Sequence, residues 1–443
     1  MAKRITSGAA AFLLDAACMG IAGWAAGRGV AGLPAACTTL LWCYALGLYR
    51  REAIAATRVA LGRLPVAVGF GVVSWAMVGA VVPAVARVGA FPFLFAGLLA
   101  AGAISRAVLA WLRARGFFRA HLLVLGAGRR AWELALLLRR EGRNLAYELV
   151  FLHDPALGPV EPRLLAEGEV VVEIRGSLLA IAQSRATEAI VVAPDERRGM
   201  RLDALLECKI AGIPIVEYLT FLERETRRID LKRLDLSWIL FADGFFFGVL
   251  DRALKRAADV LVSFLLLAIV APFLLAAMAL VWLDDGAPVF YRQQRVTRHG
   301  VRFHILKLRT MRRDAEARGA VWAAERDPRI TRVGTLLRRT RLDELPQLFN
   351  ILRGDMSFVG PRPERPEFVD ALSREIPLYA ERHAVKAGLT GWAQINYPYG
   401  ASLDDARSKL SYDLYYIKNF SILFDILIIM QTLRAVLWPS GVR

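Results

Sequence analysis

Four long apolar segments open the chain. Each holds roughly 18–23 residues, about the length that a helix needs to cross 30 Å of hydrocarbon. The segments lie at about 9–28, 32–49, 64–86 and 91–112. The pattern therefore predicts a first domain, 1–116, with four transmembrane helices, and a buried helical core is the alternative.

Lysine and arginine flank these segments unevenly. On one side of the predicted membrane stand Lys3, Arg4, Arg50, Arg51, Arg58, Arg63, Arg113, Arg115 and Arg119, and on the other only Arg28 and Arg87. The positive-inside rule places the N-terminus and everything after residue 113 in the cytoplasm. The basic start followed by an apolar run resembles a signal peptide, but no clear cleavage site follows, so we interpret it as a retained helix.

From His121 the pattern changes to short apolar strands that alternate with helical stretches. Strands are expected at 121–125, 148–152, 170–173, 189–192 and 214–216. Such alternation is typical of a parallel sheet with helices on its faces. The sequence therefore predicts a Rossmann-like α/β domain at about 117–225.

This domain holds a candidate nucleotide turn. The first strand leads into Gly126-Ala-Gly128, and Asp154 stands near the end of the second strand. Dinucleotide-binding folds use such glycines to approach a pyrophosphate and such an acid to bind a ribose. Against nucleotide binding, Arg129 and Arg130 occupy the turn and the domain has no Tyr-x-x-x-Lys pair. Nucleotide binding and a structural or regulatory remnant both stay open.

A fifth apolar run follows a polar connector at 226–250. It extends from Val260 to Leu283, with Pro272 at its middle. A proline removes a helix hydrogen bond and clashes with the preceding turn, so it can bend a helix back toward the face it entered. We expect a re-entrant helix at about 257–283, broken at Pro272, in a mainly helical, monotopic catalytic domain of 251–443. A kinked but complete span is the alternative.

Composition narrows the class of partner. The chain is 56% hydrophobic and carries a net charge of +17. Basic residues attract nucleic acid, anionic lipid and phosphorylated substrates alike, and the apolar segments favour the last two over nucleic acid. The four cysteines, Cys18, Cys37, Cys43 and Cys208, form no CxxC pair, so we expect neither a disulfide nor a metal–thiolate site.

Candidate catalytic residues are most concentrated between residues 336 and 364. Adjacent carboxylates, Asp343 and Glu344, stand among arginines, and two more cations lie upstream in the run that begins at His304. These cations are Lys307, Arg309, Arg338, Arg341 and Arg362. An isolated Asp-Glu pair is usually a solvated surface feature, but phosphoryl transfer needs carboxylates surrounded by cations. We expect the cations to depress the pKa of the nucleophilic carboxylate and keep it ionised.

Several motifs together resemble the bacterial sugar transferase family, the monotopic polyprenyl-phosphate phosphoglycosyl transferases. In order they are Lys255-Arg256-x-x-Asp259, the membrane segment with Pro272, Pro288-Val-Phe, Gln294-x-Arg, Lys307-Leu-Arg-Thr-Met, Asp343-Glu-Leu-Pro-Gln-Leu, Gly360-Pro-Arg-Pro and Gly388-Leu-Thr-Gly-Trp-Ala-Gln. The resemblance covers about 250–440. The whole layout is similar to the long members, typified by undecaprenyl-phosphate galactose or glucose phosphotransferases of capsule, exopolysaccharide or O-antigen assembly.

The resemblance implies that Asp343 attacks a UDP-sugar, that UMP leaves, and that undecaprenyl phosphate then accepts the sugar phosphate. It implies that Glu344, with Asp343, holds Mg²⁺. Further implied phosphate or substrate contacts are Lys307, Arg309, Arg338, Arg362, Lys386, Thr390, Trp392 and Gln394; for the last four, a structural loop packed by Trp392 is the alternative. It also implies a multi-pass protein of the bacterial inner membrane with its catalytic domain on the cytoplasmic face.

The segment departs from the family pattern at two places. Ala387 stands where a proline is common, and Asn396-Tyr-Pro-Tyr replaces a more frequent Asn-Gly turn. Glucose or galactose is expected from the resemblance, but these departures leave the sugar open. A non-catalytic nucleotide-sensing scaffold and a membrane-bound nucleotide-sugar oxidoreductase are the competing hypotheses, and a homodimer is the expected assembly.

Overall fold

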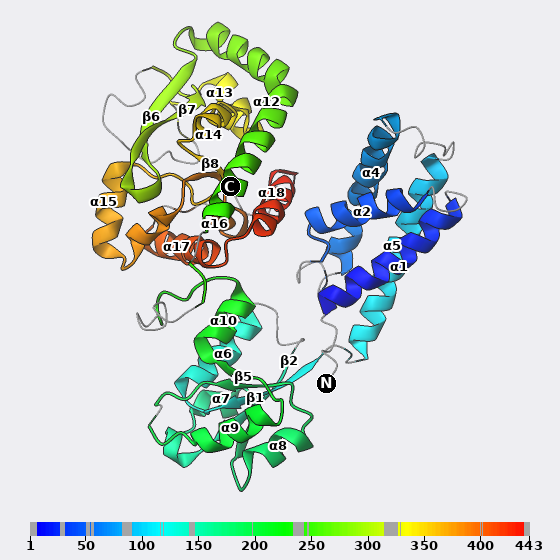
Figure 1. Ribbon diagram of the computed structural model, residues 1–443, viewed down its shortest axis with the longest axis vertical. Helices are drawn as coiled ribbons and strands as arrows, with labels where there is room; N and C mark the ends of the chain where they lie inside the picture. Colours follow the sequence, from blue (N-terminus) through cyan, green and yellow to red (C-terminus); the bar gives the residue numbers. More distant parts are fainter. Residues whose placement is uncertain are drawn as a thin grey trace. The chain divides into compact units, whose positions relative to one another are not determined.

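The computed structural model describes residues 7–26, 32–49, 54, 57–81, 91–115, 117, 119–140, 147–196, 198–233, 243–245, 248–313, 327, 329–398, 400 and 402–437, without the side chains of some helix-end residues. The chain divides into two compact units, Met1–Thr226 and Arg227–Arg443. Each unit is described by itself below (Figure 1).

Apolar helices form the first part of the first unit. They are α1 (Ser7–Ala26), α2 (Leu33–Ala45), α4 (Thr57–Val81) and α5 (Phe91–Ala114). Helix α1 packs against α2 and α5, and α4 packs against α2 and α5. Apolar windows of 18 residues in α4 and 21 in α5 are long enough to cross a membrane, whereas the apolar parts of α1 (Ala9–Ala25) and α2 are shorter. The structure thus has several apolar helices where the sequence predicts four spans.

The residues that set the predicted orientation are largely beyond what the structure describes. Lys3, Arg4, Arg28, Arg50, Arg51 and Arg87 lie outside the described residues, as do the side chains of Arg58 and Arg113. The cytoplasmic placement of the N-terminus stays a prediction.

A five-stranded sheet follows, with the order β3-β2-β1-β4-β5. Its strands are β1 (Ala120–Leu125), β2 (Tyr147–His153), β3 (Val170–Glu173), β4 (Ala189–Val192) and β5 (Ile215–Glu217). Every neighbouring pair is parallel, so the predicted parallel sheet is confirmed. Successive side chains of a strand point to opposite faces, and both faces carry a core here.

Helices cover both faces of this sheet. They are α6 (Arg129–Arg140), α7 (Pro162–Ala166), α8 (Leu178–Ser184), α9 (Leu202–Ile210) and α10 (Tyr218–Thr226), with a 3₁₀ turn, η3 (Pro155–Leu157). Leu122 and Val124 of β1 pack with helices α6 and α10, whereas Leu123 and Leu125 pack with α8 and α9. Because both faces of β1 are buried, its sequence is a continuous apolar run.

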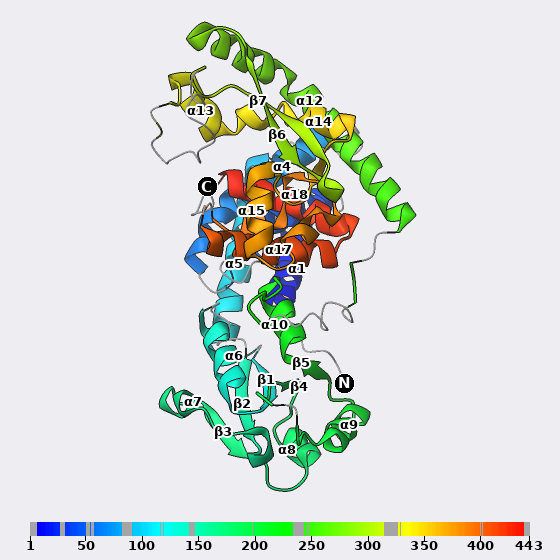
Figure 2. The ribbon, with the colours of Figure 1, turned by 90° about the vertical axis from the view of Figure 1, so that its left-hand side faces the viewer.

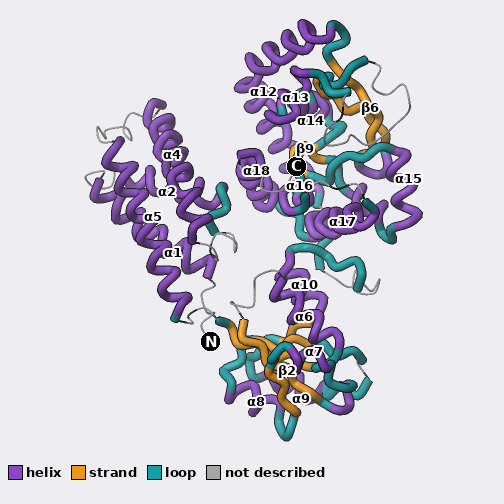
Figure 3. The backbone as a smooth tube through the Cα atoms, turned by 180° about the vertical axis from the view of Figure 1, so that it is seen from behind, coloured by secondary structure: helices purple, strands orange, loops and turns teal. Residues whose placement is uncertain are grey.

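The second unit is mainly helical (Figure 3), and its described residues form two small sheets of two strands each. Its elements are α12 (Val249–Asp285), β6 (Phe290–Val296), η4 (Arg298–Gly300), β7 (Arg302–Leu308), α13 (Arg332–Thr340), η5 (Leu342–Glu344), α14 (Gln347–Arg353), β8 (Ser357–Val359), α15 (Pro366–Glu375), η6 (Tyr379–Ala384), β9 (Gly388–Thr390), α16 (Trp392–Asn396), α17 (Leu403–Lys418) and α18 (Ile422–Leu437). Strands β6 and β7 form an antiparallel hairpin, and β8 pairs with β9 in parallel.

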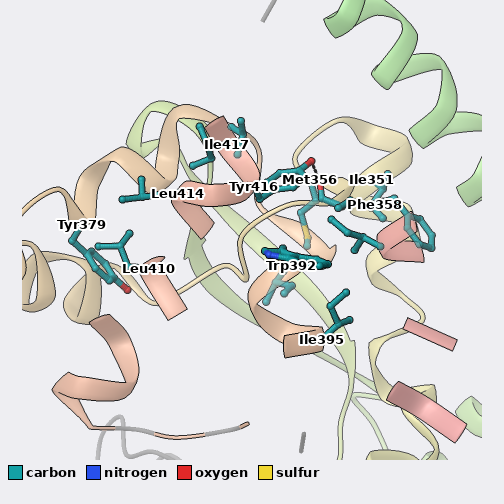
Figure 4. Close-up of a cluster of buried hydrophobic side chains, with 14 of the residues drawn as sticks. Ile351, Met356, Phe358, Tyr379, Trp392, Ile395, Leu410, Leu414, Tyr416 and Ile417 are labelled. Carbon is teal, nitrogen blue, oxygen red and sulfur yellow. Dashed lines mark hydrogen bonds between the residues drawn. The ribbon is translucent and has the colours of Figure 1, made fainter. Parts of the chain in front are cut away.

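The main core of this unit lies between α14, β8, α16, α17 and α18 (Figure 4). Trp392 and Tyr416 are its largest members, and both are almost fully buried. The backbones of Gly360 and Gly388 approach so closely that a Cβ on Gly388 would lie 2.1 Å from the nitrogen of Gly360. This close approach fixes the chain at the end of β8, where the Pro-Arg-Pro turn begins.

Helix α12 corrects the expected break at Pro272. It runs as one helix of 37 residues with Pro272 inside it, and Figures 1 and 2 show a bend along its course. A proline inside a helix removes one hydrogen bond and kinks the axis, while the turns on both sides can stay helical. The predicted break is therefore wrong, because the residues on both sides of Pro272 belong to one bent helix.

Candidate active site

The acidic pair lies in a tight turn between two helices. Helix α13 starts at its N-cap Thr331, whose hydroxyl accepts from the nitrogen of Gly334, and ends at Arg341, which has a left-handed backbone (φ 61°). The next residues form the 3₁₀ turn η5, which carries Asp343 and Glu344. A non-glycine residue with positive φ is strained and is often found at functional sites. The left-handed turn leads the chain inward, and Asp343 is buried.

Two cations from separate elements meet on Glu344. Lys307 Nζ of strand β7 lies 3.0 Å from Glu344 Oε1, and Arg362 Nη2 lies 3.0 Å from the same oxygen. Lys307 and Arg362 are 55 residues apart in sequence, so only the fold brings them together. The predicted grouping of Lys307, Glu344 and Arg362 is therefore present as direct contacts.

Asp343 keeps an unused carboxylate oxygen. Its Oδ1 is buried and accepts no hydrogen bond within the described part of the chain. An unsatisfied buried acceptor costs about 1–3 kcal/mol, and a water, a bound ion or a reaction partner can satisfy it. Nearby Arg338 is held by its Nε, which donates to Thr310 Oγ1 at 2.9 Å.

The two carboxylates differ in their electrostatic environment. Burial raises the pKa of Asp343, and the charge of Glu344 raises it further against the opposing effect of Lys307, Arg338 and Arg341. Burial also acts to raise the pKa of Glu344, but Lys307, Arg362 and Arg341 hold that pKa well below its usual range. The cations lower the pKa of Asp343 as expected, but the expectation that they determine its net direction is wrong. At Asp343 the effect of burial on the pKa exceeds that of the cations, whereas at Glu344 the effect of the cations exceeds that of burial.

The acidic pair fits a divalent cation in part. In the described residues no group of three or more His, Cys, Asp or Glu side chains clusters as a metal site. Mg²⁺, however, is commonly held by one or two carboxylates together with substrate phosphates. The free Oδ1 of Asp343 and the ionised Glu344 supply that number of ligands.

Arg309 follows strand β7 and contacts the C-terminal end of helix α12. Its Nη2 donates to the carbonyl oxygens of Asp285 (2.9 Å) and Gly286 (2.7 Å), and the Asp285 carboxylate is 3.2 Å away. The last carbonyls of a helix have no partner within the helix, and Arg309 satisfies them. Its visible contacts tie α12 to β7, and a phosphate-binding role stays a prediction.

The downstream candidates make their polar contacts within the protein. Lys386 Nζ donates to the carbonyl of Gly354 at 2.7 Å, and the hydroxyls of Thr390 and Thr432 are 2.7 Å apart. Trp392 is buried in the core and donates from Nε1 to the carbonyl of Arg227 at 2.9 Å. Gln394 Nε2 donates to the carbonyl of Leu389 at 3.2 Å. Trp392 thus packs in the core, and a substrate contact by these four residues stays a prediction.

Two buried acidic residues hold elements that surround the site. Asp259 of α12 accepts from the hydroxyl of Ser357 (2.8 Å) and the backbone nitrogen of Phe358 (3.0 Å). Asp413 of α17 accepts from Arg382 at 2.9 Å. Asp259 could be suspected from sequence because a charged residue near an apolar helix needs a partner. Asp413 carries no comparable signal.

The nucleotide turn of the first unit is filled by the protein itself. Asp195 accepts from the backbone nitrogens of Arg129 (2.7 Å) and Arg130 (2.9 Å), the first residues of α6. A Cβ on Gly128 would lie 2.1 Å from a carboxylate oxygen of Asp195. The N-terminus of this helix is where a pyrophosphate binds in nucleotide-binding folds. Here a carboxylate occupies that position.

The other two candidate residues of this turn also have local roles. Gly126 has a left-handed backbone (φ 111°), and a Cβ there would lie 2.8 Å from the carbonyl oxygen of Ala193. Asp154 accepts from the nitrogen of Ala156 at 3.0 Å and so caps η3, with Arg201 at 3.7 Å. Glycine is needed at 126 for the turn itself, whatever the domain binds.

Comparisons with known proteins agree on one family. Residues 250–439 match the family model described as bacterial sugar transferase. The UDP-glucose:undecaprenyl-phosphate glucose-1-phosphate transferase of Escherichia coli is 32% identical over 350 residues, covering 76% of this chain and 72% of that protein. A Caulobacter vibrioides protein of the same description is 41% identical over 185 residues, 41% of this chain and 69% of its own length.

A third relative differs in the sugar that its name gives. The UDP-N-acetylgalactosamine-undecaprenyl-phosphate N-acetylgalactosaminephosphotransferase of Aeromonas hydrophila is 40% identical over 242 residues. The alignment covers 54% of this chain and 56% of that relative, so it spans little more than half of the Aeromonas protein. The relatives thus share an acceptor in their names but not a sugar.

Proposed function

The chain belongs to the bacterial sugar transferase family, and from this premise we propose that it transfers a sugar 1-phosphate from a UDP-sugar to undecaprenyl phosphate. The single observation that carries the proposal is the buried Oδ1 of Asp343, which accepts no hydrogen bond from the residues that the structure describes. It lies next to Glu344, which contacts two cations. The products are undecaprenyl-diphosphate-sugar and UMP, and the step would initiate exopolysaccharide, capsule or O-antigen synthesis.

The proposed reaction has two displacements at one phosphorus atom. An ionised oxygen of Asp343 attacks the phosphorus that bears the sugar, and the bond from that phosphorus to the oxygen of UMP breaks. A phosphate oxygen of undecaprenyl phosphate then attacks the same phosphorus, and the bond to Asp343 breaks. The carboxylate is regenerated, so one residue serves both steps.

Lys307, Arg338 and Arg362 would neutralise the phosphate oxygens. Charge develops on these oxygens in phosphoryl transfer, and fixed cations in a site shielded from water stabilise it most. Lys307 is largely enclosed. Burial lowers its pKa, but the negative charge of Glu344 opposes this effect and favours the charged form that binds phosphate. Bound Mg²⁺ would be held by Asp343, Glu344 and the donor's phosphates, and would supply further positive charge.

The membrane setting follows from the acceptor. Its polyprenyl tail lies in the bilayer, so its phosphate can be presented only near the headgroups. Helix α12 has a mean hydropathy of 2.8 in its apolar window, and it exposes Phe264, Ile269 and Phe273. We propose a bacterial inner-membrane protein with four transmembrane helices, a Rossmann-like domain whose turn is closed by Asp195, and a catalytic unit on the cytoplasmic face.

The test is release of UMP from a panel of UDP-sugars by the purified protein in detergent, with Mg²⁺ and undecaprenyl phosphate. Wild type is compared with Asp343→Asn and with Asp370→Asn, an exposed carboxylate on α15 of the same unit. We expect release that depends on Mg²⁺ and is lost only in Asp343→Asn, and a sugar-phosphate adduct on the peptide that carries Asp343. Folded wild type that releases no UMP from any donor would refute the proposal.

A further inference from the structure

A buried arginine stands behind the Pro-Arg-Pro turn. Arg382 of η6 is 5% exposed. Its Nη1 donates to the hydroxyl of Tyr379 at 2.7 Å, and its Nη2 donates to Asp413 Oδ2 at 2.9 Å. The same Nη2 donates to the backbone carbonyl of Arg362 at 3.1 Å. One guanidinium thus joins η6, α17 and the turn that carries a phosphate-binding candidate.

A buried ion pair such as Arg382–Asp413 contributes little to stability by itself. Removing two charges from water is unfavourable, and apolar residues of the same volume often stabilise a core equally well. What the pair provides is geometry, because Asp413 and Tyr379 fix the guanidinium at two points while it holds the Arg362 carbonyl. A planar guanidinium with directed donors is suited to such a three-way contact.

The turn around Arg362 is held at every carbonyl. The carbonyl of Pro361 accepts from the nitrogen of Gly388 (2.8 Å). That of Pro363 accepts from Arg295 (3.2 Å), and that of Glu364 accepts from the nitrogen of Val296 (3.0 Å). Prolines on both sides of Arg362 fix their own φ angles. Arg382 therefore contacts the backbone carbonyl of the same residue whose side chain reaches Glu344.

We propose that Arg382, fixed by Asp413 and Tyr379, is a positioning residue that aims the guanidinium of Arg362 at Glu344 and at the donor's phosphates. Arg362 Nη2 lies 3.0 Å from Glu344 Oε1. The position of this side chain depends on the Arg362 backbone, whose carbonyl accepts a hydrogen bond from buried Arg382. The inference deepens the proposed function and rests on it for the identity of the phosphates. It adds a residue that acts through another and does not itself touch the reacting atoms.

The first test is a double-mutant cycle on kcat/KM for UMP release. Arg382→Lys keeps a charge opposite Asp413 but cannot make all three contacts, and Tyr379→Phe removes only a hydroxyl. We expect Arg382→Lys to lower kcat/KM by about 10- to 100-fold, the effect of misplacing a catalytic group by about 1 Å. In an Arg362→Met background the same change should cost less than about threefold, because the residue it positions is gone.

The matched control is Arg139→Lys in the α/β domain. Arg139 also joins two acidic side chains, Glu167 and Glu169, far in sequence from the turn. We expect this variant to keep wild-type kcat/KM. If Arg382→Lys lowers kcat/KM by the same factor with and without Arg362, its effect is general destabilisation and the positioning role is overturned.

A second measurement does not depend on activity. Hydrogen exchange of the segment 358–366 reports directly on how firmly the turn is held. We expect faster exchange there in Arg382→Lys and Tyr379→Phe, and wild-type exchange in Arg139→Lys. Unchanged exchange in both test variants would overturn the inference. Wild type that releases no UMP would instead refute the proposed function, and the exchange result alone would then decide whether Arg382 holds the turn.

Discussion

Asp259 tests how helix α12 supports strand β8 and the turn that follows it. Its carboxylate is buried in α12 and accepts from the Ser357 hydroxyl (2.8 Å) and the Phe358 nitrogen (3.0 Å), while Lys255 lies 3.6 Å away. Strand β8 leads directly into Gly360 and the Pro-Arg-Pro turn. Replacing Asp259 by alanine therefore perturbs the helix, the strand and the turn at one point.

The expected loss of stability can be worked out from these contacts. The Ser357 hydroxyl retains an acceptor, because the Val359 carbonyl lies 3.0 Å away. The Phe358 N–H has no such substitute, and leaving it unpaired costs about 1–3 kcal/mol. Lys255 retains Asp425 at 2.6 Å, so its loss is smaller. Together we expect about 3 kcal/mol for Asp259→Ala and about 1 kcal/mol for Asp259→Asn, which retains one acceptor oxygen.

The assay is a thermal shift in detergent, combined with UMP release at a temperature where all variants are folded. For a unit of this size, each kcal/mol corresponds to about 2–4 °C in Tm, so Asp259→Ala should unfold roughly 6–12 °C below wild type. The control is Asp251→Asn, an exposed capping residue at the start of the same helix, which should cost less than about 1 kcal/mol. If Asp259→Ala and Asp251→Asn unfold within about 2 °C of each other, the reasoning is refuted.

Three further outcomes follow from the geometry. Because burial and the charge of Glu344 raise the pKa of Asp343 above its ordinary 3.8, the carboxylate is protonated as pH falls through that raised value; the acid limb of kcat/KM should lie above pH 3.8 and move to lower pH in Glu344→Gln. Because Asp195 fills the helix N-terminus, calorimetry should detect no binding of NAD or NADP to wild type, and micromolar binding would contradict this. Finally, cysteines introduced by Leu250→Cys and Leu283→Cys, in a chain without its own four, should both react with a membrane-impermeant maleimide from the cytoplasmic side and not from the other.

Much of the fold could be predicted because it rests on local patterns. Short apolar runs separated by helical stretches predicted the strands of the parallel sheet, and β3 and β4 have the expected ends. The apolar helices were also found by composition, although the apolar part of α1 (Ala9–Ala25) and helix α2 (Leu33–Ala45) are shorter than the predicted segments. The effect of Pro272 was not predictable from its position alone, because packing on both sides keeps the helix intact around it.

The site was predictable only as far as its motifs extend. Lys307, Glu344 and Arg362 were grouped by the resemblance, and the fold places them within hydrogen-bond distance. Arg382 and Asp195 act through partners 20 to 66 residues away in sequence, and no local pattern marks such contacts. The direction of the pKa of Asp343 depends on burial, which a count of neighbouring cations does not reveal.

The contacts of helix α12 with the second unit bear on whether the helix crosses the membrane. Near its start Lys255 pairs with Asp425, and at its end Arg309 holds the last carbonyls. Between them Leu274 and Ala277 are buried against the same unit. At about 1.5 Å per residue, 37 residues extend over roughly 55 Å, yet both ends and one face contact one compact body. A helix that crossed the bilayer would separate its ends by the membrane, so this packing favours a helix that enters and lies at one face. A bend is then sufficient where the sequence predicted a break, and a helix of this kind is compatible with the cytoplasmic catalytic face that the proposed function requires.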